Sequence, residues 1–220
     1  MFVKVCGIKE KFEIDVVVKY PVSHFGVIVG VRAFSDDAVS LDKAKELITY
    51  FRSMKRPFPI PTLVTHLQSF GEIADFIYEL GVSFIPLQND VSLSVMRELK
   101  LEFPWLAIIK AIHVFGDFKS ILDKLKTYEE VVDYILLDSY DGFRLGGTGL
   151  IHDWSIDSAI RCKTNKPIIV AGGLSGYNVR EVVSLVRPFG VDANSRLKGK
   201  DGFKDELKVR DFVLNYYRAL

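Results

Sequence analysis

The sequence has few cysteines, almost no net charge and no long apolar run. Only Cys6 and Cys162 occur in 220 residues, which argues against a disulfide framework and favours a reducing compartment. The formal net charge is +1, so there is no electrostatic reason to expect a nucleic-acid partner. No apolar stretch approaches the ~20 residues of a membrane span, and the N-terminus lacks a signal-peptide pattern. We expect a cytoplasmic protein that binds neither nucleic acid nor membranes.

Metal-binding patterns are missing as well. The chain has 4 histidines, and none of them stands in the HxxxH or HExxH spacing that places two imidazoles on one helix face. We therefore expect no metal site.

What the sequence does have is a regular alternation of strand-like and helix-like segments. Apolar, mostly β-branched runs occur at residues 2–6, 26–31, 62–65, 83–87, 107–112, 134–138, 167–171 and 190–193. Such runs are typical of strands buried on both faces. Helical periodicity occurs at residues 41–51, 71–80, 92–101, 118–126, 157–162, 178–186 and 205–220. Ser40 stands where it can cap the helix that begins at residue 41.

This alternation predicts an α/β protein in which residues 1–220 form a single-domain (β/α)8 TIM barrel. Typical barrels of this kind have about 250 residues, so the chain is a compact example. A doubly wound open sheet is the alternative. That fold normally carries a GxGxxG motif after its first strand, and no such motif follows residues 2–6.

In a barrel, the residues at the C-terminal ends of the strands form the site. Cys6 ends the first strand-like run, Asp138 ends the sixth, and Asp192 lies in the eighth. Lys4 shares a strand face with Cys6, because side chains two apart in a strand point the same way. A thiol can accept a proton and a partly buried carboxyl can donate one, so Cys6 and Asp138 are a candidate base and acid.

Plainer interpretations of these residues stay open. Cys6 could be a small buried hydrophobe, Asp138 could cap a helix, and Lys4 could serve structure near the barrel floor. We expect Cys162, which lies in a helical segment, to be a packing residue.

Two glycine-rich loops are candidates for binding an anion. Gly172 and Gly173 follow the seventh run, and a helix is expected to start near Tyr177. Glycines let backbone N–H groups approach a phosphate, to which a helix N-terminus adds partial positive charge. Gly147 lies in the second loop, LGGTGLIHDWS. Either loop could also be a plain turn without a ligand.

Together these segments resemble the phosphoribosylanthranilate isomerase family of tryptophan biosynthesis. The opening VKVCGIK is similar to that family's KICGI motif, and LLDS with GGTGLIHDWS resembles its LLD and GGTGxxFDW stretches. IIVAGGLSGYNV resembles the family's AGGLxxxNV turn, and RPFGVDANS its PxGVDVSS segment. The matches follow one another in order from the first strand to the last helix.

The resemblance implies the Amadori rearrangement of N-(5-phosphoribosyl)anthranilate to 1-(2-carboxyphenylamino)-1-deoxyribulose 5-phosphate. It implies that Cys6 is the general base and Asp138 the general acid, with no cofactor, because the substrate nitrogen serves as electron sink. It also implies substrate contacts from Gly147, Gly172, Gly173, Asp192, Asn194 and Ser195. The partner would be a small phosphorylated molecule, and the protein a monomer or homodimer.

Three departures from the family pattern concern substrate binding. The arginine that holds the anthranilate carboxylate falls on Asp37, and Arg32 stands nearby as a substitute or as a surface charge. Gln88 replaces the strand-four histidine, preceded by Pro86 where the family has glutamine. Arg196 replaces a glycine of the phosphate site, where it could bind phosphate as a bidentate donor or fill the site.

These departures leave two alternative functions open. The chain could act on another phosphorylated aminosugar or ketose, or it could bind a phosphorylated ligand without turnover. The presence of both Cys6 and Asp138 favours a working isomerase.

Overall fold

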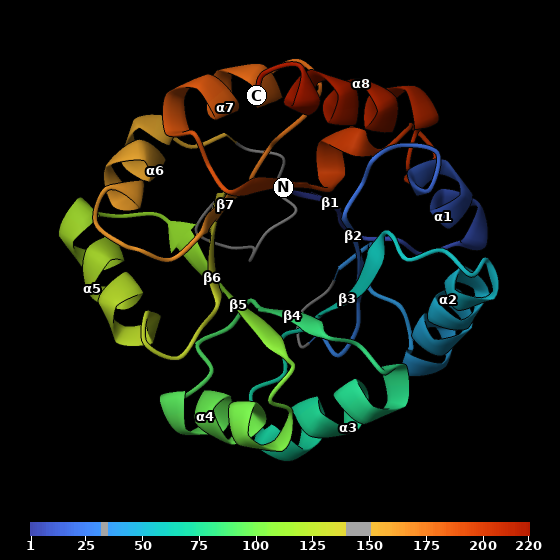
Figure 1. The fold of residues 1–220 in the computed structure, drawn as a ribbon, viewed down its shortest axis with the longest axis horizontal. Coiled ribbons are helices and arrows are strands. Elements are labelled where there is room, and N and C mark those ends of the chain that lie inside the picture. Colours follow the sequence, from blue (N-terminus) through green and yellow to red (C-terminus); the bar gives the residue numbers. More distant parts are fainter. Residues whose placement is uncertain (32–34, 140–150) are drawn as a thin grey trace.

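The computed structural model describes residues 1–31, 35–139 and 151–220, which form a ring of helices around a barrel of strands (Figure 1). The strands are β1 Phe2–Val5, β2 His24–Ile28, β3 Ile60–Val64, β4 Phe84–Leu87, β5 Ala107–Val114, β6 Tyr134–Ser139, β7 Ile168–Val170 and β8 Gly190–Ala193. The helices are α1 Lys11–Val17, α2 Leu41–Ser53, α3 Phe70–Leu80, α4 Leu93–Glu102, α5 Phe118–Tyr128, α6 Trp154–Arg161, α7 Val179–Val186 and α8 Glu206–Tyr217. A short 3₁₀ turn, η1 Ser195–Leu197, follows β8.

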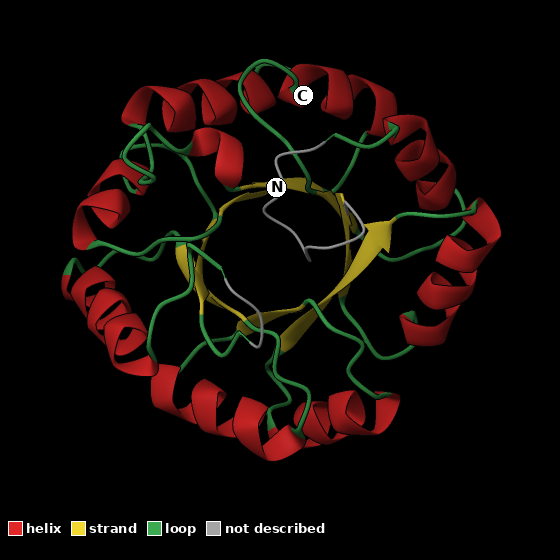
Figure 2. Ribbon diagram, turned by 180° about the vertical axis from the view of Figure 1, so that it is seen from behind, coloured by secondary structure: helices red, strands yellow, loops and turns green. Residues whose placement is uncertain are grey.

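The strand order confirms the predicted (β/α)8 barrel. All strand pairs are parallel, in the order β3-β2-β1-β8-β7-β6-β5-β4. The ring closes between β3 and β4 through a parallel bridge of Thr65 with Leu87. Figure 2, seen from behind, shows the same closed cylinder with every helix outside it. The C-terminal ends of all strands therefore meet at one end of the barrel.

One helix is absent from the sequence-based prediction. α1 has only 7 residues, too few for helical periodicity to stand out. It begins at Lys11, and Glu13 in its first turn is buried: its Oε2 accepts hydrogen bonds from the backbone N–H groups of Lys9 (2.7 Å) and Glu10 (2.9 Å). At the next helix the prediction is confirmed, because the Ser40 hydroxyl accepts a hydrogen bond from the N–H of Lys43 at 3.1 Å.

The apolar core has two main parts, besides a small cluster of Cys6, Ile28 and Val64. The larger lies between the strands and the helices, where residues such as Val5, Leu47 and Ile108 are fully buried. The smaller lies inside the barrel, whose N-terminal end is filled by aromatic rings. Phe2 stacks on His24 with ring centroids 4.2 Å apart. Burial is the main reason that the pKa of His24 falls to about 3, so this imidazole stays neutral and the floor of the barrel is apolar.

Close packing of β1 against β8 depends on a glycine. A Cβ placed on Gly190 would lie 2.3 Å from the carbonyl oxygen of Phe2 and 2.4 Å from its Cβ. We expect Gly190→Ala to lower the free energy of unfolding by about 1–3 kcal/mol, because a rigid backbone must move to admit the methyl group. Urea unfolding measures this loss.

Gly71→Ala is the matched control. Gly71 lies in the first turn of α3 with nothing within 4 Å of an added Cβ, so its replacement should leave stability unchanged or slightly higher. Equal unfolding midpoints for the two variants would contradict the packing argument.

Candidate active site

Cys6 lies immediately beyond the end of β1, which stops at Val5. Its N–H still donates to the carbonyl of Ala193 on β8 at 2.9 Å. The thiol faces the barrel interior and is 7% exposed, beside Ile28 and Val64. Gly26 on the neighbouring strand makes room for it, since a Cβ there would lie 2.8 Å from Sγ. The thiol is thus at the catalytic end of the barrel, with a small opening to solvent.

Directly below Cys6, a buried ion pair crosses from β1 to β8. Lys4 and Asp192 are register partners, and Lys4 Nζ donates to Asp192 Oδ2 at 2.6 Å. The expectation that Lys4 lies in the interior is confirmed, because only 1% of it is exposed. Burial alone would lower the pKa of Lys4, but Asp192 and Cys6 together raise it, so Lys4 stays charged.

The two charges of this ion pair have opposite effects on the pKa of the Cys6 thiol. Burial raises the pKa of Cys6, the Lys4 ammonium lowers it, and the Asp192 carboxylate raises it again. The net pKa lies above the ordinary value of a thiol. Cys6 is therefore a strong base once ionised, with Lys4 as the counter-charge for its thiolate.

Asp138 is buried at the C-terminal end of β6, which does not fit a solvated loop carboxylate. Burial, with the Asp192 carboxylate second, raises its pKa to about 7. Near neutral pH a large fraction of Asp138 therefore carries a proton that it can donate. β8 and β7 stand between β1 and β6 in the ring, so Asp138 and Cys6 lie on different walls of the barrel.

Gly172 and Gly173 have φ angles of +82° and +63°, a conformation that glycine adopts without strain. The turn after them is closed by Asn178, which accepts from the N–H of Ser175 at 2.8 Å and donates to the carbonyl of Gly173 at 2.9 Å. α7 begins at Val179, two residues after the expected start near Tyr177. The loop is thus a tight glycine turn in front of a helix, and its role in binding an anion stays a prediction.

The loop after β8 is partly occupied by protein contacts. The Asn194 amide donates to Asp37 Oδ2 and accepts from Lys204 Nζ, both at 2.9 Å. Ser195 and Arg196 follow in the turn η1, with Arg196 exposed. Ser195 and Arg196 thus stand at the mouth, while Asn194 is held within the wall.

Asp37, at the position of the missing arginine, is buried among cations. Lys198 Nζ lies 2.5 Å and Lys9 Nζ 3.6 Å from Asp37 Oδ1. Although burial opposes them, hydrogen bonds from Lys198 and Asn194 and the charge of Lys204 lower its pKa. Asp37 is therefore an ionised structural anion. Lys204 was missed in the sequence because nothing local marks a contact between such distant segments.

A second missed network ends on Asp157. Ser139 Oγ lies 2.8 Å from His152 Nδ1, and His152 Nε2 lies 2.7 Å from Asp157 Oδ1. Asp157 is fully buried in α6. The Cβ of a residue at position 172 would collide with the Ser139 hydroxyl at 2.1 Å, so this chain of contacts also fixes the spacing between β6 and the Gly172 turn. The sequence did contain one indication of this network, because His152 stands where the family motif has phenylalanine.

The remaining sequence-based expectations divide as follows. Arg32 and Gly147 lie outside the described residues. Cys162 is exposed at the end of α6, so the prediction that it packs in the core was wrong; the helix turns this position outward.

In the described part of the chain, no group of three or more His, Cys, Asp or Glu side chains could hold a metal ion. Nor does any helix described there have the length and apolar character to cross a membrane.

Comparison with known proteins identifies the family. Residues 3–215 match the family model described as N-(5'phosphoribosyl)anthranilate (PRA) isomerase. The chain belongs to the phosphoribosylanthranilate isomerase family. N-(5'-phosphoribosyl)anthranilate isomerase 2 of Methanosarcina mazei is 38% identical over 215 residues, covering 97% of this chain and 92% of that protein.

Solved structures of the family share the barrel. The Pyrococcus furiosus isomerase superposes with a TM-score of 0.79 at 30% identity, covering 99% of each chain. The Thermotoga maritima isomerase gives 0.84 at 24% identity, again over 99% of each chain. A further isomerase structure, in complex with reduced 1-(o-carboxyphenylamino)-1-deoxyribulose 5-phosphate, gives 0.81 at 23% identity with the same coverage. The resemblance noted from the motifs is thus confirmed for family and fold.

The opposing effects of Lys4 and Asp192 on Cys6 can be separated by mutation. Lys4→Met removes a cation that lowers the pKa of the Cys6 thiol, so that pKa should rise further; Asp192→Asn removes an anion that raises it, so it should fall. The pH dependence of Cys6 alkylation by iodoacetamide measures both shifts. The background is Cys162→Ser, because Cys162 is exposed. Shifts in the same direction would refute this arrangement of charges.

Proposed function

We propose that this chain catalyses the Amadori rearrangement of N-(5-phosphoribosyl)anthranilate, with Asp138 as general acid and Cys6 as general base. The observation that carries the proposal is the placement of a carboxyl with a pKa of about 7 and a buried thiol on separate walls of one barrel mouth. Membership of the isomerase family supports the same reaction.

The acid step opens the sugar ring. Protonated Asp138 gives its proton to the furanose ring oxygen while the substrate nitrogen donates its lone pair, which breaks the C1′–O bond and leaves a Schiff base. Burial of Asp138 keeps this proton available near neutral pH, which is the tuning that general acid catalysis needs.

The base step moves a proton from carbon. The Cys6 thiolate removes the C2′ proton, the electrons flow toward the iminium nitrogen, and the resulting enolamine tautomerises to the ketone. Lys4, paired with Asp192, stabilises the thiolate from inside the barrel. The buried Oδ1 of Asp192 has no hydrogen-bond partner among the described residues, which supports a contact from Asp192 to a ribose hydroxyl.

Substrate phosphate is assigned to the loops after β7 and β8. Gly172 and Gly173 present the left-handed turn, Ser195 and Arg196 lie in η1 after the neighbouring strand, and Gly147 is a further candidate from the sequence. Asn194 contributes by positioning this loop through Asp37 and Lys204. A cytoplasmic location remains a prediction from the low cysteine content.

One observation favours a second candidate, a related isomerase for another phosphorylated aminosugar. The arginine position holds Asp37, an anion already paired with lysines, so the anthranilate carboxylate has no partner there. Turnover of phosphoribosylanthranilate separates the two candidates directly.

The decisive experiment follows the fluorescence of phosphoribosylanthranilate generated in situ. Cys6→Ser and Asp138→Asn should each lower kcat/KM by roughly 100-fold or more, because each removes a proton-transfer group. Cys162→Ser and Asp123→Asn, both at exposed positions, are the matched controls and should keep wild-type rates. Loss of activity in the controls, or its retention in either site variant, would refute the assigned roles.

The pH dependence of kcat/KM follows from the two pKa values. The competent enzyme has Asp138 protonated and Cys6 ionised, although Asp138 titrates at about 7 and the pKa of Cys6 is raised. The fraction in this form is level between the two pKa values and falls on either side. We expect a profile that declines below about pH 7 and stays level into the alkaline range. Asp192→Asn should move the acidic limb to lower pH, since Asp192 raises the pKa of Asp138; an acidic optimum in the wild type would exclude this assignment.

A further inference from the structure

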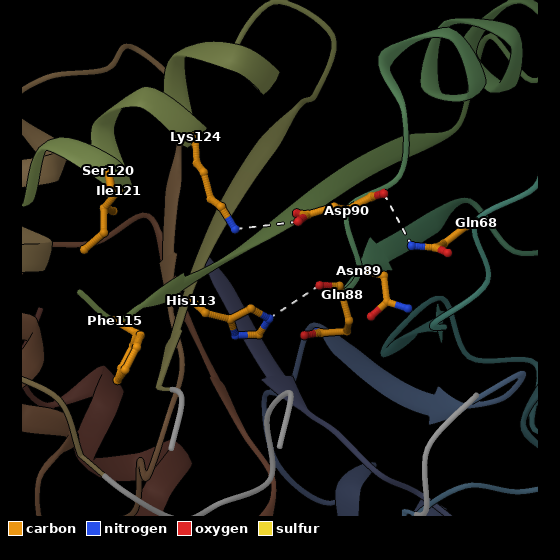
Figure 3. A pocket seen from close by; sticks show the side chains of 9 residues that line it. All are labelled: Gln68, Gln88, Asn89, Asp90, His113, Phe115, Ser120, Ile121 and Lys124. Carbon is orange, nitrogen blue, oxygen red and sulfur yellow. Dashed lines mark hydrogen bonds and ion pairs between the residues drawn. The ribbon is translucent and has the colours of Figure 1, made fainter. Parts of the chain in front are cut away.

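A cavity of about 510 Å³ opens at the catalytic end of the barrel, over β4 and β5 (Figure 3). It lies across the mouth from β8, because β4 and β8 are four places apart in the ring of strands. The phosphate loops and this cavity therefore stand on opposite sides of Cys6 and Asp138. A ligand with phosphate at one end and a second recognised group at the other can span this distance across the mouth.

The cavity begins beside the proposed acid. His113 lines it, and His113 on β5 is the register partner of Asp138 on β6. Register partners on adjacent parallel strands point their side chains to the same face, so both side chains face the mouth at one level. A group attached to the C1′ nitrogen of a ribose held between Cys6 and Asp138 is thus directed toward this cavity.

The walls of the cavity differ in polarity. Phe115 and Ile121 supply an apolar side (Figure 3). Gln88 lies on the other side, and its buried Oε1 has no hydrogen-bond partner among the described residues. A flat apolar ring that carries a polar substituent matches these two walls.

The charges favour an anionic substituent. Asp90 is the only carboxylate among the described residues that line the cavity. Two lysines lie near its carboxylate: Lys124, which lines the cavity, and Lys110, which is buried behind it. Lys124 Nζ is 3.6 Å from Asp90 Oδ2, and Lys110 Nζ is 3.8 Å from Asp90 Oδ1. His113 adds no charge near neutral pH, since burial lowers its pKa to about 4. Burial lowers the pKa of Lys110 to about 8, so it is still mainly protonated at pH 7, and one positive charge remains in excess.

We propose that this cavity binds the carboxylate-bearing aromatic ring of the substrate, and that Lys124 pairs with the carboxylate. The inference rests on the proposed function, because that reaction supplies an anthranilate group. It accounts for Asp37 at the arginine position: recognition of the carboxylate has moved from the loop after β2 to the middle of α5. Lys124 is a specificity residue and takes no part in proton transfer.

The test compares two substrates, N-(5-phosphoribosyl)anthranilate and N-(5-phosphoribosyl)aniline, which lacks the carboxylate. Lys124→Met should lower kcat/KM for the first by about tenfold, mainly through KM, and leave the second unchanged. Lys124→Arg should restore most of the loss. Lys119→Met, which removes an exposed lysine of the same helix that does not line the cavity, is the control and should behave as wild type.

The proposal would be overturned if Lys124→Met lowered kcat/KM equally for both substrates. It would also be overturned if Arg32→Met, and not Lys124→Met, abolished the preference for the substrate that carries the carboxylate. A binding measurement makes the inference independent of turnover. 2-Aminobenzoate, titrated by its own fluorescence, should bind about tenfold more weakly to Lys124→Met than to wild type or Lys119→Met. If the wild type shows this Lys124-dependent binding without turnover, the cavity assignment stands and the proposed reaction fails. If turnover is normal but Lys124→Met binds 2-aminobenzoate as tightly as the wild type, the cavity assignment is wrong and the proposed reaction stands.

Discussion

The buried ion pair between Lys4 and Asp192 is the interaction on which the site depends. Two charges are removed from water inside the barrel, and each is tolerated only because the other lies 2.6 Å away. Their strands pair in a register that places these side chains at one level. Any change that shifts β1 against β8, such as a side chain at Gly190, therefore disturbs packing and electrostatics together.

The same pair acts electrostatically on both Asp138, the proposed acid, and Cys6, the proposed base. Asp192 raises the pKa of both Cys6 and Asp138, while Lys4 lowers both. Asp138 keeps a proton near neutral pH because burial and the Asp192 carboxylate oppose its ionisation. Cys6 can still ionise because Lys4 stays charged beside it. One interior ion pair thus shifts the pKa values of two groups that lie on different walls of the barrel.

Much of this arrangement was predictable because it depends on local pattern. Strand and helix periodicity, with the rule that barrel strands end at one face, placed Cys6, Asp138 and Gly172 correctly. The alternation of side chains along a strand also predicted correctly that Lys4 lies in the barrel interior. The predictions failed where the local pattern is too short to read: α1 has only 7 residues, and Cys162 follows the last residue of α6, where it is exposed. Contacts of Asp37 with Lys198 and Lys204 join distant loops, which no single-sequence periodicity encodes.

Asp37 shows how a change of charge in the loop after β2 bears on where the substrate carboxylate can bind. In this chain its carboxylate is bound by Lys9, Lys198 and the Asn194 amide, so it stabilises the wall between β2 and β8 while cancelling positive charge there. At that wall the nearby lysines are already engaged by Asp37, whereas Lys110 and Lys124 share the single carboxylate of Asp90 over β4 and β5. The proposed cavity assignment uses this difference: the carboxylate-bearing ring would lie over β4 and β5, and the phosphate would lie at the glycine turn after β7. Under the proposed assignment, different walls of the barrel hold the two negatively charged ends of the substrate, so the ribose would lie between them, within reach of the walls that carry Cys6 and Asp138.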